Sequence, residues 1–386
     1  CPPGPGPLPN PHRTVQASVA GGWCGICIYI SSGYPVADAI WQTNRPEVRP
    51  MVLKLVNDRE IWDSFVDASP YGLLFHKWDY LTITAQHTGY RLLPYGVYKG
   101  EELVCLAPLY FKSTHGVKML FSPPPMQAVI PYQGLVLAKE FDALKLGKKE
   151  VVMDLVATDL SAEIDAISPH YFSLVLVPGF TDVRQFLWRG YAPKVHYTYT
   201  IDLSRSTEGI WGDFHYKLRN KIRRAEKAGM DLVRSTDISI LYTSLAERFS
   251  QPDMNIPMVS KRYFEDLFRA YPDHLATYYL YDHEGTLTGA VATQEYRRFL
   301  LWMGTPRIEG ISANEYLQWL LVQRARAEGY SYLENIGANT PDLNFFKSKF
   351  CSSLGMYMEV FRKDMVGTLA EWAYSTIVNK PWLKRR

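Results

Sequence analysis

The chain has 386 residues, of which 47% are hydrophobic and 14% aromatic, so it can build folded cores and is too long for one ordinary domain. Its mean hydropathy is -0.16, and no run of about 18 apolar residues occurs, which excludes a membrane-spanning helix. The net charge of +3 does not by itself indicate a nucleic-acid partner. Five scattered cysteines exclude a disulfide framework and fit a reducing cytosol.

Residues 1–50 differ in composition from the rest of the chain. They open with the proline-rich stretch CPPGPGPLPNPHRTVQ, and no helical or strand periodicity persists up to Pro50. Cys24 and Cys27 form one CxxC pair, but no second pair completes four ligands, so no metal site is predicted. We expect ordered chain from Met51 and interpret residues 1–50 as an extension, disordered or not native, that can be deleted without loss of folding.

Residues 51–196 alternate between helix and strand patterns. Lys99-Gly100 signals a hairpin, and Pro123-Pro124-Pro125 ends a strand and stiffens the loop that follows. These signals predict a mixed α/β sheet with helices on its faces. Helices are predicted at 58–68, 77–87 and 150–167, and strands at 91–99, 102–112, 117–122, 134–138 and 171–177.

Residues 197–365 repeat the same order of elements without obvious sequence identity. A helix at 210–229 has a cap at 204–207 and ends at Gly229. The repeat predicts two similar domains in tandem, 51–196 and 197–365, followed by an amphipathic basic tail at 366–386. The other predicted helices lie at 238–249 and 261–271, and the strands at 231–234, 276–282, 288–295 and 298–303.

Residues 301–350 form the most informative segment. A strand, a glycine-containing loop, an amphipathic helix ending at Gly329, a second strand and a basic aromatic segment follow one another closely. This order predicts a β-loop-α-β unit whose helix N-terminus can bind an anionic acyl carrier. No Ser-His-Asp or Cys-His spacing is evident, so direct transfer is favoured over a covalent nucleophile.

Four blocks occur in a fixed order along the chain. They are DVRQFLWRGYAPKVHYTYTIDL (182–203), LRNKIRRAEKAG (218–229), SANEYLQWLLVQRARAEGYSYLENIG (312–337) and FFKSKF (345–350). Together they resemble the Fem family of tandem-GNAT proteins. The resemblance covers about residues 51–363 and implies an α/β fold of two GNAT-like (acyl-CoA N-acyltransferase) domains. It also implies transfer of an acyl or aminoacyl group to an amine, from acyl-CoA or aminoacyl-tRNA.

The chain departs from the bridge-forming members of that family in lacking room for a long helical arm after Gly229. This departure favours the shorter acetyltransferase-like branch over the tRNA-dependent one. The resemblance then implies no tightly bound cofactor, and acyl-CoA or aminoacyl-tRNA as co-substrate, of which acyl-CoA is favoured. It implies an acceptor amine on a polysaccharide, a peptidoglycan-type molecule or another cell-envelope molecule, which can be linked to a lipid or a nucleotide. It also implies a cytoplasmic enzyme, with a peripheral position at the inner membrane face as the alternative. The alternative hypothesis is a non-catalytic GNAT-like binding or scaffold protein.

The donor is expected at the start of the helix in residues 301–350. Arg307, Gly310 and Ser312 resemble the R-x-x-G-x-G/A pyrophosphate loop of GNAT enzymes, with serine where glycine or alanine is usual. The same residues also fit an ordinary turn in which Ser312 and Glu315 form a capping box. Asn314 either hydrogen-bonds the donor or caps a turn.

The catalytic residues are expected near the end of the second strand and in the FFKSKF segment. The resemblance matches Lys347 with the family's lysine at the transfer site, beside Phe346, to stabilise an oxyanion or a donor phosphate. Glu334 stands where family members often place an acid and can accept the amine proton if burial raises its pKa. Tyr199 is a candidate to orient the acceptor, and Asn335 to bind the donor, although core packing or turn capping fits both.

Three cations are candidates for an acceptor phosphate. Arg219 and Arg223 are four residues apart and share a helix face, which is either a phosphate clamp or a solvated basic face. Lys77 lies where relatives bind acceptor phosphate. The tail at 366–386 is interpreted as either a packing helix or a peripheral contact with an anionic membrane.

Overall fold

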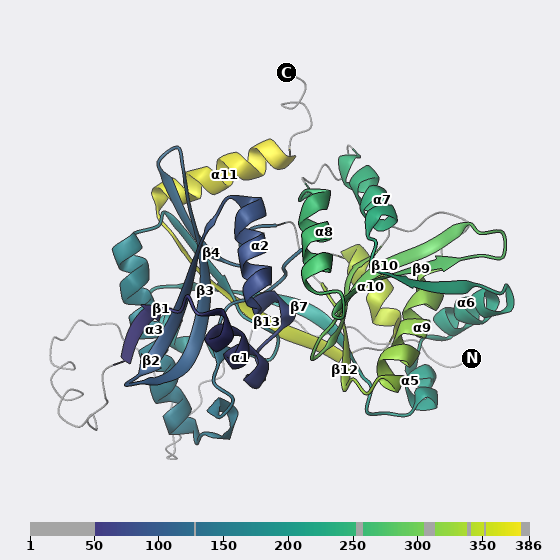
Figure 1. The fold of residues 1–386 in the computed structure, drawn as a ribbon, viewed down its shortest axis with the longest axis horizontal. Coiled ribbons are helices and arrows are strands. Elements are labelled where there is room, and N and C mark those ends of the chain that lie inside the picture. The colour runs from purple at the N-terminus through teal and green to yellow at the C-terminus, as the bar shows by residue number, and fades with distance from the viewer. Residues whose placement is uncertain are drawn as a thin grey trace, which may run out of the picture. The chain divides into compact units, whose positions relative to one another are not determined.

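One mixed β-sheet runs through the protein and joins its two halves (Figure 1). The computed structural model describes residues 51–126, 129–251, 258–304, 313–337, 341–350 and 353–379, which belong to one compact unit of residues 49–386. Within these ranges the 13-stranded sheet has the order β1-β2-β3-β4-β6-β13-β7-β12-β11-β10-β9-β8, with β5 paired to β3. No helix in them is long and apolar enough to cross a bilayer.

The first half of the described chain runs from β1 to α4. Asp58 caps α1 by accepting hydrogen bonds from the backbone N–H groups of Glu60 and Ile61. Gly100 has a φ of +68°, which suits the turn of the predicted hairpin. The elements are β1 (Met51–Leu55), α1 (Arg59–Ala68), η1 (Leu74–His76), α2 (Trp78–Thr88), β2 (Arg91–Lys99), β3 (Glu102–Thr114), β4 (Val117–Ser122), β5 (Val136–Leu137), η2 (Phe141–Ala143), α3 (Leu146–Ile167), β6 (Tyr171–Val175) and α4 (Arg184–Leu187).

The second half runs from β7 to α11. Helix α6 ends at Lys227 and β8 begins at Asp231, so no arm is inserted between them, as expected. The elements are β7 (Ala192–Asp202), α5 (Thr207–Asp213), α6 (Tyr216–Lys227), β8 (Asp231–Ser235), α7 (Ser239–Ser250), α8 (Lys261–Ala270), β9 (Leu275–Tyr281), β10 (Leu287–Glu295), β11 (Phe299–Gly304), α9 (Asn314–Ala327), β12 (Tyr332–Asn335), α10 (Pro341–Lys347), η3 (Ser348–Phe350), β13 (Ser353–Lys363) and α11 (Met365–Asn379).

The single helix predicted at 210–229 is wrong, because the chain breaks between α5 and α6. Phe214 leaves the helical path and buries its ring against Trp319 and Phe350, at centroid distances of 5.3 and 5.2 Å. His215 then begins α6, with its Nδ1 accepting from the N–H of Lys217 at 3.2 Å. Burial of one aromatic ring therefore outweighs continuous helical periodicity.

Strand β13 was not predicted, and it is the strand that connects the halves. It pairs antiparallel with β6 on one side and with β7 on the other. The boundary expected between residues 196 and 197 falls inside β7, and the two-domain division stays a prediction. The two halves thus share one continuous sheet.

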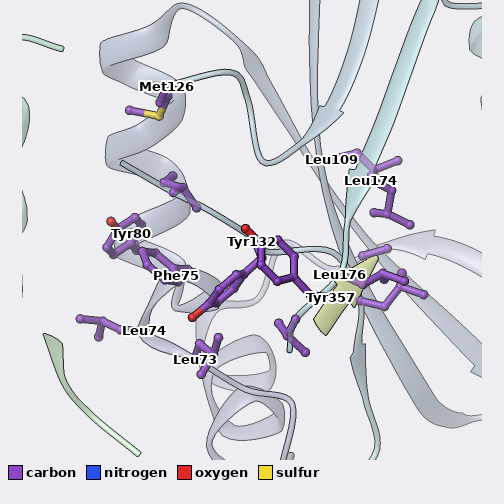
Figure 2. Close-up of a cluster of buried hydrophobic side chains, with 14 of the residues drawn as sticks. Leu73, Leu74, Phe75, Tyr80, Leu109, Met126, Tyr132, Leu174, Leu176 and Tyr357 are labelled. Atoms are coloured by element: carbon purple, nitrogen blue, oxygen red, sulfur yellow. The ribbon is translucent and has the colours of Figure 1, made fainter. Parts of the chain in front are cut away.

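A large hydrophobic core fills the space between the halves on one face of the sheet. Tyr132, which follows the Pro123–Pro125 turn region, packs its ring against Phe75 at 5.9 Å and against Tyr357 of β13 at 5.3 Å (Figure 2). Helices α2 and α8 also lie side by side, and the backbone N–H of Tyr80 donates to the hydroxyl of Tyr271 at 3.0 Å. These contacts hold the first half against the strands that carry the site.

Candidate functional site

The candidate site lies where the neighbouring parallel strands β11 and β12 separate. Their pairing ends with Leu301 opposite Asn335, although β11 continues to Gly304. The helix α9 connects the two strands, which confirms the predicted β-loop-α-β order. Ligands in sheets of this kind bind beyond the carboxyl ends of parallel strands. The side chains at the end of β12 are therefore the first candidates for functional residues.

Glu334 is the buried carboxyl group of this site, with 1% of its surface exposed. Its Oε1 accepts hydrogen bonds from the Tyr132 hydroxyl at 2.7 Å and the Thr198 hydroxyl at 2.8 Å. Its Oε2 lies 3.6 Å from Nη1 of Arg298, outside hydrogen-bond distance. We expected Glu334 just after the strand, but it is inside β12 and its side chain points to the buried face.

Burial raises the pKa of Glu334, and the charge of Arg298 and the two hydroxyl hydrogen bonds oppose the rise only in part. A carboxyl group held in this way exchanges a proton closer to neutral pH than an exposed one does. The side chain of Arg298 is 29% exposed, so this residue lies next to the buried carboxyl group and also contacts solvent. The arrangement suits proton transfer.

Lys347 is the last residue of α10 and is also buried, with 7% exposed. Its ammonium donates to the carbonyl of Gly337 at 2.7 Å and to the carbonyl of Ile336, the residues that follow β12. Burial lowers the pKa of Lys347 to about 8, against the opposing charge of Glu334. A lysine ammonium has three donors, so one remains for a further acceptor.

Three other predicted residues surround the end of β12. Tyr199 and Asn335 are opposite each other in the β7–β12 pairing, on the face away from Glu334. The Tyr199 hydroxyl donates to the Asn344 side-chain oxygen, and Asn335 donates to Gln318 at 3.0 Å. Phe346 packs against Phe350 with ring centroids 5.8 Å apart. The structure thus places Tyr199 and Asn335 on one face at the end of β12 and Glu334 on the other, while Lys347 donates to the residues that follow the strand and Phe346 belongs to the packing.

The predicted donor loop can be followed only in part. Arg307, Gly310 and Ser312 lie outside the described residues. Asn314 begins α9, and its side-chain oxygen would lie 2.7 Å from a Cβ placed on Gly289 of β10. The alternative capping box does not describe the start of α9, because Ala313 is the N-cap residue and Glu315 reaches Nζ of Lys221 on α6 at 2.6 Å. An ion pair between helices is favoured over a local cap.

The predicted phosphate-binding cations lie apart from one another. Lys77 has its Nζ 2.9 Å from Asp67 and 3.7 Å from Asp63, so its charge is balanced within the first half. On α6, the Arg223 guanidinium lies 5.5 Å from the Trp211 ring centroid. Arg219 is half-buried on the same helix. These contacts favour structural roles for Lys77 and Arg223. No contact in the described part of the chain defines a role for Arg219.

Sequence reasoning missed Tyr132, Thr198 and Arg298, which surround Glu334. Tyr132 is 202 positions away from Glu334 in the sequence, so no local pattern connects them. The proline-rich turn before Tyr132 is the one signal available, since it fixes the path of that segment.

A buried polar face continues from Glu334 across β7 and β13. His196 stacks on Tyr357 at 5.1 Å, and its Nε2 lies 2.7 Å from Oε2 of Glu359. The Ser173 hydroxyl donates to the other oxygen of Glu359 at 2.8 Å. We call His196, Thr198, Glu334 and Glu359 the buried polar face of the central strands.

The opposite side of the same strands is apolar and open to solvent. Val195 and Tyr197 of β7 pair in register with Met358 and Met356 of β13. The exposed fractions are 44% for Val195, 36% for Tyr197, 55% for Leu354 and 49% for Met356. We call these four residues the exposed apolar face. It adjoins Tyr199, whose hydroxyl contacts α10.

Glu334 and Lys347 lie in a segment that is similar to a known protein family. Residues 212–347, which span α6 to α10, match the family described as acetyltransferase (GNAT) domain. This part of the second half is therefore similar to a GNAT domain. FemX superposes with a TM-score of 0.58 at 13% identity, over 80% of this chain and 96% of FemX. The predicted resemblance to Fem-like tandem-GNAT proteins is thereby confirmed at the level of the fold.

Two further solved structures share the fold of this GNAT-containing chain. The C-terminal domain of a putative lysylphosphatidylglycerol synthetase from Agrobacterium fabrum has a TM-score of 0.51 at 10% identity, covering 77% of this chain and 91% of that domain. L-PGS from Bacillus licheniformis has a TM-score of 0.50 at 12% identity, covering 84% and 98%. No curated protein sequence matches the chain. Sequence identities this low establish the fold alone.

Proposed function

We propose that this protein is an N-acyltransferase that moves an acyl or aminoacyl group to an amine by direct transfer. The observation that carries the proposal is Glu334, a buried carboxyl group with a raised pKa at the end of β12 inside the GNAT domain. A GNAT domain implies acyl-CoA as the donor. The reaction needs a group that takes the amine proton and a donor for the developing oxyanion.

Each candidate residue has a defined part in such a transfer. The acceptor nitrogen bonds to the acyl carbonyl carbon, Glu334 takes its proton, and the carbon–sulfur bond of the thioester breaks. The proton then passes to the departing thiolate, which leaves Glu334 ionised for the next cycle. The remaining N–H donor of Lys347 stabilises the oxyanion, while its other donors hold the carbonyls of Ile336 and Gly337.

The acceptor proposed is a cell-envelope amine that carries an apolar portion. FemX and two proteins named for lysylphosphatidylglycerol synthesis share the fold, and their names support an envelope acceptor and an aminoacyl group. The exposed apolar face beside Tyr199 supports the apolar portion, because exposed apolar surface of this kind commonly marks a binding site. Direct passage from α6 to β8 favours acyl-CoA over aminoacyl-tRNA as donor.

A donor screen tests this proposal. The purified chain is titrated by calorimetry with acetyl-CoA, a longer acyl-CoA and an aminoacyl-tRNA, and thiol release is then followed with an amine acceptor. We expect binding of an acyl-CoA, with Glu334→Gln retaining donor binding and losing turnover. A chain that binds none of the three donors would instead be the non-catalytic binding or scaffold protein.

A further inference from the structure

Helix α11 (Met365–Asn379) carries a stripe of exposed apolar side chains. Met365, Leu369 and Trp372 follow one another at spacings of four and three residues, which places them on one helix face. Their exposed fractions are 82%, 63% and 66%, and the adjacent Val366 is 42% exposed. This stripe is distinct from the transfer site and contributes nothing to the hydrophobic core.

The other side of α11 is fixed to the sheet. A Cβ placed on Gly367 would lie 2.0 Å from the carbonyl oxygen of His170, so the helix backbone touches the segment before β6. The carboxylate of Glu371 pairs with the ammonium of Lys363 and accepts from the Tyr171 hydroxyl at 3.3 Å. Figure 1 shows α11, in yellow, crossing the ends of the strands. The apolar stripe therefore has a fixed direction, away from the sheet.

The sequence that follows this stripe is positively charged. Glu371 is the only acid in the sequence from residue 365 to residue 386, and it is paired with Lys363. After α11 the sequence contains four cations, Lys380, Lys384, Arg385 and Arg386, which lie outside the described part of the chain. An apolar helix face with nearby lysine and arginine is the composition that binds the interface of anionic bilayers.

We propose that the exposed face of α11 binds an anionic phospholipid bilayer, with the helix axis parallel to the membrane surface. A second copy of the chain is a poorer occupant, because both copies carry the same basic sequence after α11 and like charges repel. Anionic headgroups instead complement the cations, while the apolar side chains enter the region beneath them. Membrane binding through this surface does not depend on the proposed acyl transfer.

Vesicle co-sedimentation with the full chain tests this surface. Vesicles contain phosphatidylcholine alone or phosphatidylcholine with phosphatidylglycerol. We expect binding to the anionic vesicles, weakened by salt. The double variant Leu369→Ser/Trp372→Ser should lower the affinity by roughly tenfold or more, since it removes two buried apolar groups from the bound state. The matched control is Leu146→Ser/Trp188→Ser, because Leu146 and Trp188 are 69% and 68% exposed elsewhere on the surface.

Three outcomes would overturn the proposal. The unaltered chain does not sediment with anionic vesicles, the α11 variant and the control bind equally well, or the α11 variant abolishes a dimer seen by light scattering without changing vesicle binding. Circular dichroism of both variants shows that each remains folded. Donor binding in solution, measured in parallel, separates failure of this surface from failure of the transferase proposal.

Discussion

The two faces of the central strands differ in a way that reverses the usual arrangement of a sheet. An ordinary sheet with one solvated side buries apolar residues and exposes polar ones. Here β7, β12 and β13 bury Glu334 and Glu359 with their hydroxyl and imidazole partners. Of these strands, β7 and β13 expose apolar side chains on the opposite face.

This reversal costs stability on both sides. A buried carboxylate must be hydrogen-bonded or paired to be tolerated, and an exposed apolar group forgoes the gain from burial. Departures of this kind are expected at functional sites, where chemistry constrains the residues. The buried polar face is therefore suited to reaction and the exposed apolar face to recognition. Substitutions on the two faces should have different effects.

Glu334→Gln should have the largest effect on turnover. The amide oxygen can still accept from Tyr132 and Thr198, but the side chain cannot take the amine proton, so kcat should fall about 10²–10⁴-fold. Activity of the unaltered protein should rise with pH through the raised pKa of Glu334, and this acidic limb should disappear in the variant. Glu328→Gln at the end of α9 serves as the control. An undiminished kcat would assign Glu334 a structural role.

Lys347→Met should reduce kcat by about a hundredfold, the scale for loss of one oxyanion donor. The ammonium is protonated below its pKa of about 8, so activity of the unaltered protein should fall above that pH, and the variant should lose this alkaline limb. Lys349→Met is the matched control, since Lys349 is a half-buried neighbour whose Nζ lies over the Phe345 ring at 4.1 Å. If both variants lower activity alike, the buried ammonium has no special part.

Glu359→Gln should affect stability rather than turnover. Burial alone would raise the pKa of Glu359, but hydrogen bonds from His196 and Ser173 outweigh it, and the pKa is lowered. The ionised form thus stabilises the folded state above the ordinary carboxyl pKa, and this contribution is lost as pH falls through the folded value. Urea unfolding at pH 7 should show a loss of about 1–3 kcal/mol.

The control for Glu359 is Glu371→Gln, which removes an exposed ion pair with Lys363. Its cost should stay below about 1 kcal/mol. Equal costs for the two variants would mean that the pairs on the buried polar face contribute no more than a surface pair.

Tyr197→Ser and Met356→Ser should have the smallest effects. Both residues are largely exposed, so the free energy of unfolding should change by no more than about 0.5 kcal/mol. The KM for the acceptor should rise several-fold if its apolar portion lies on this face, with little change in kcat. Val233→Ser on the edge strand β8, 45% exposed, is the control. A KM that stays constant would leave the exposed apolar face outside recognition.

Much of the fold could be predicted because its signals are local. The predicted strands at 91–99 and 117–122 coincide with β2 and β4. The break at Phe214 and the strand β13 could not be predicted, since one depends on burial of a ring and the other on pairing between distant strands. Local periodicity carries neither kind of information.

For the candidate site, the sequence by itself determined the order of strand, helix and strand, and it supplied Glu334 and Lys347 at the positions that a Fem-like resemblance implies. Only the tertiary structure decided what these groups can do. Burial removes both groups from water, which raises the pKa of the Glu334 carboxyl group and lowers the pKa of the Lys347 ammonium. Chain order selects the residue types, but burial and long-range contacts set their charge states.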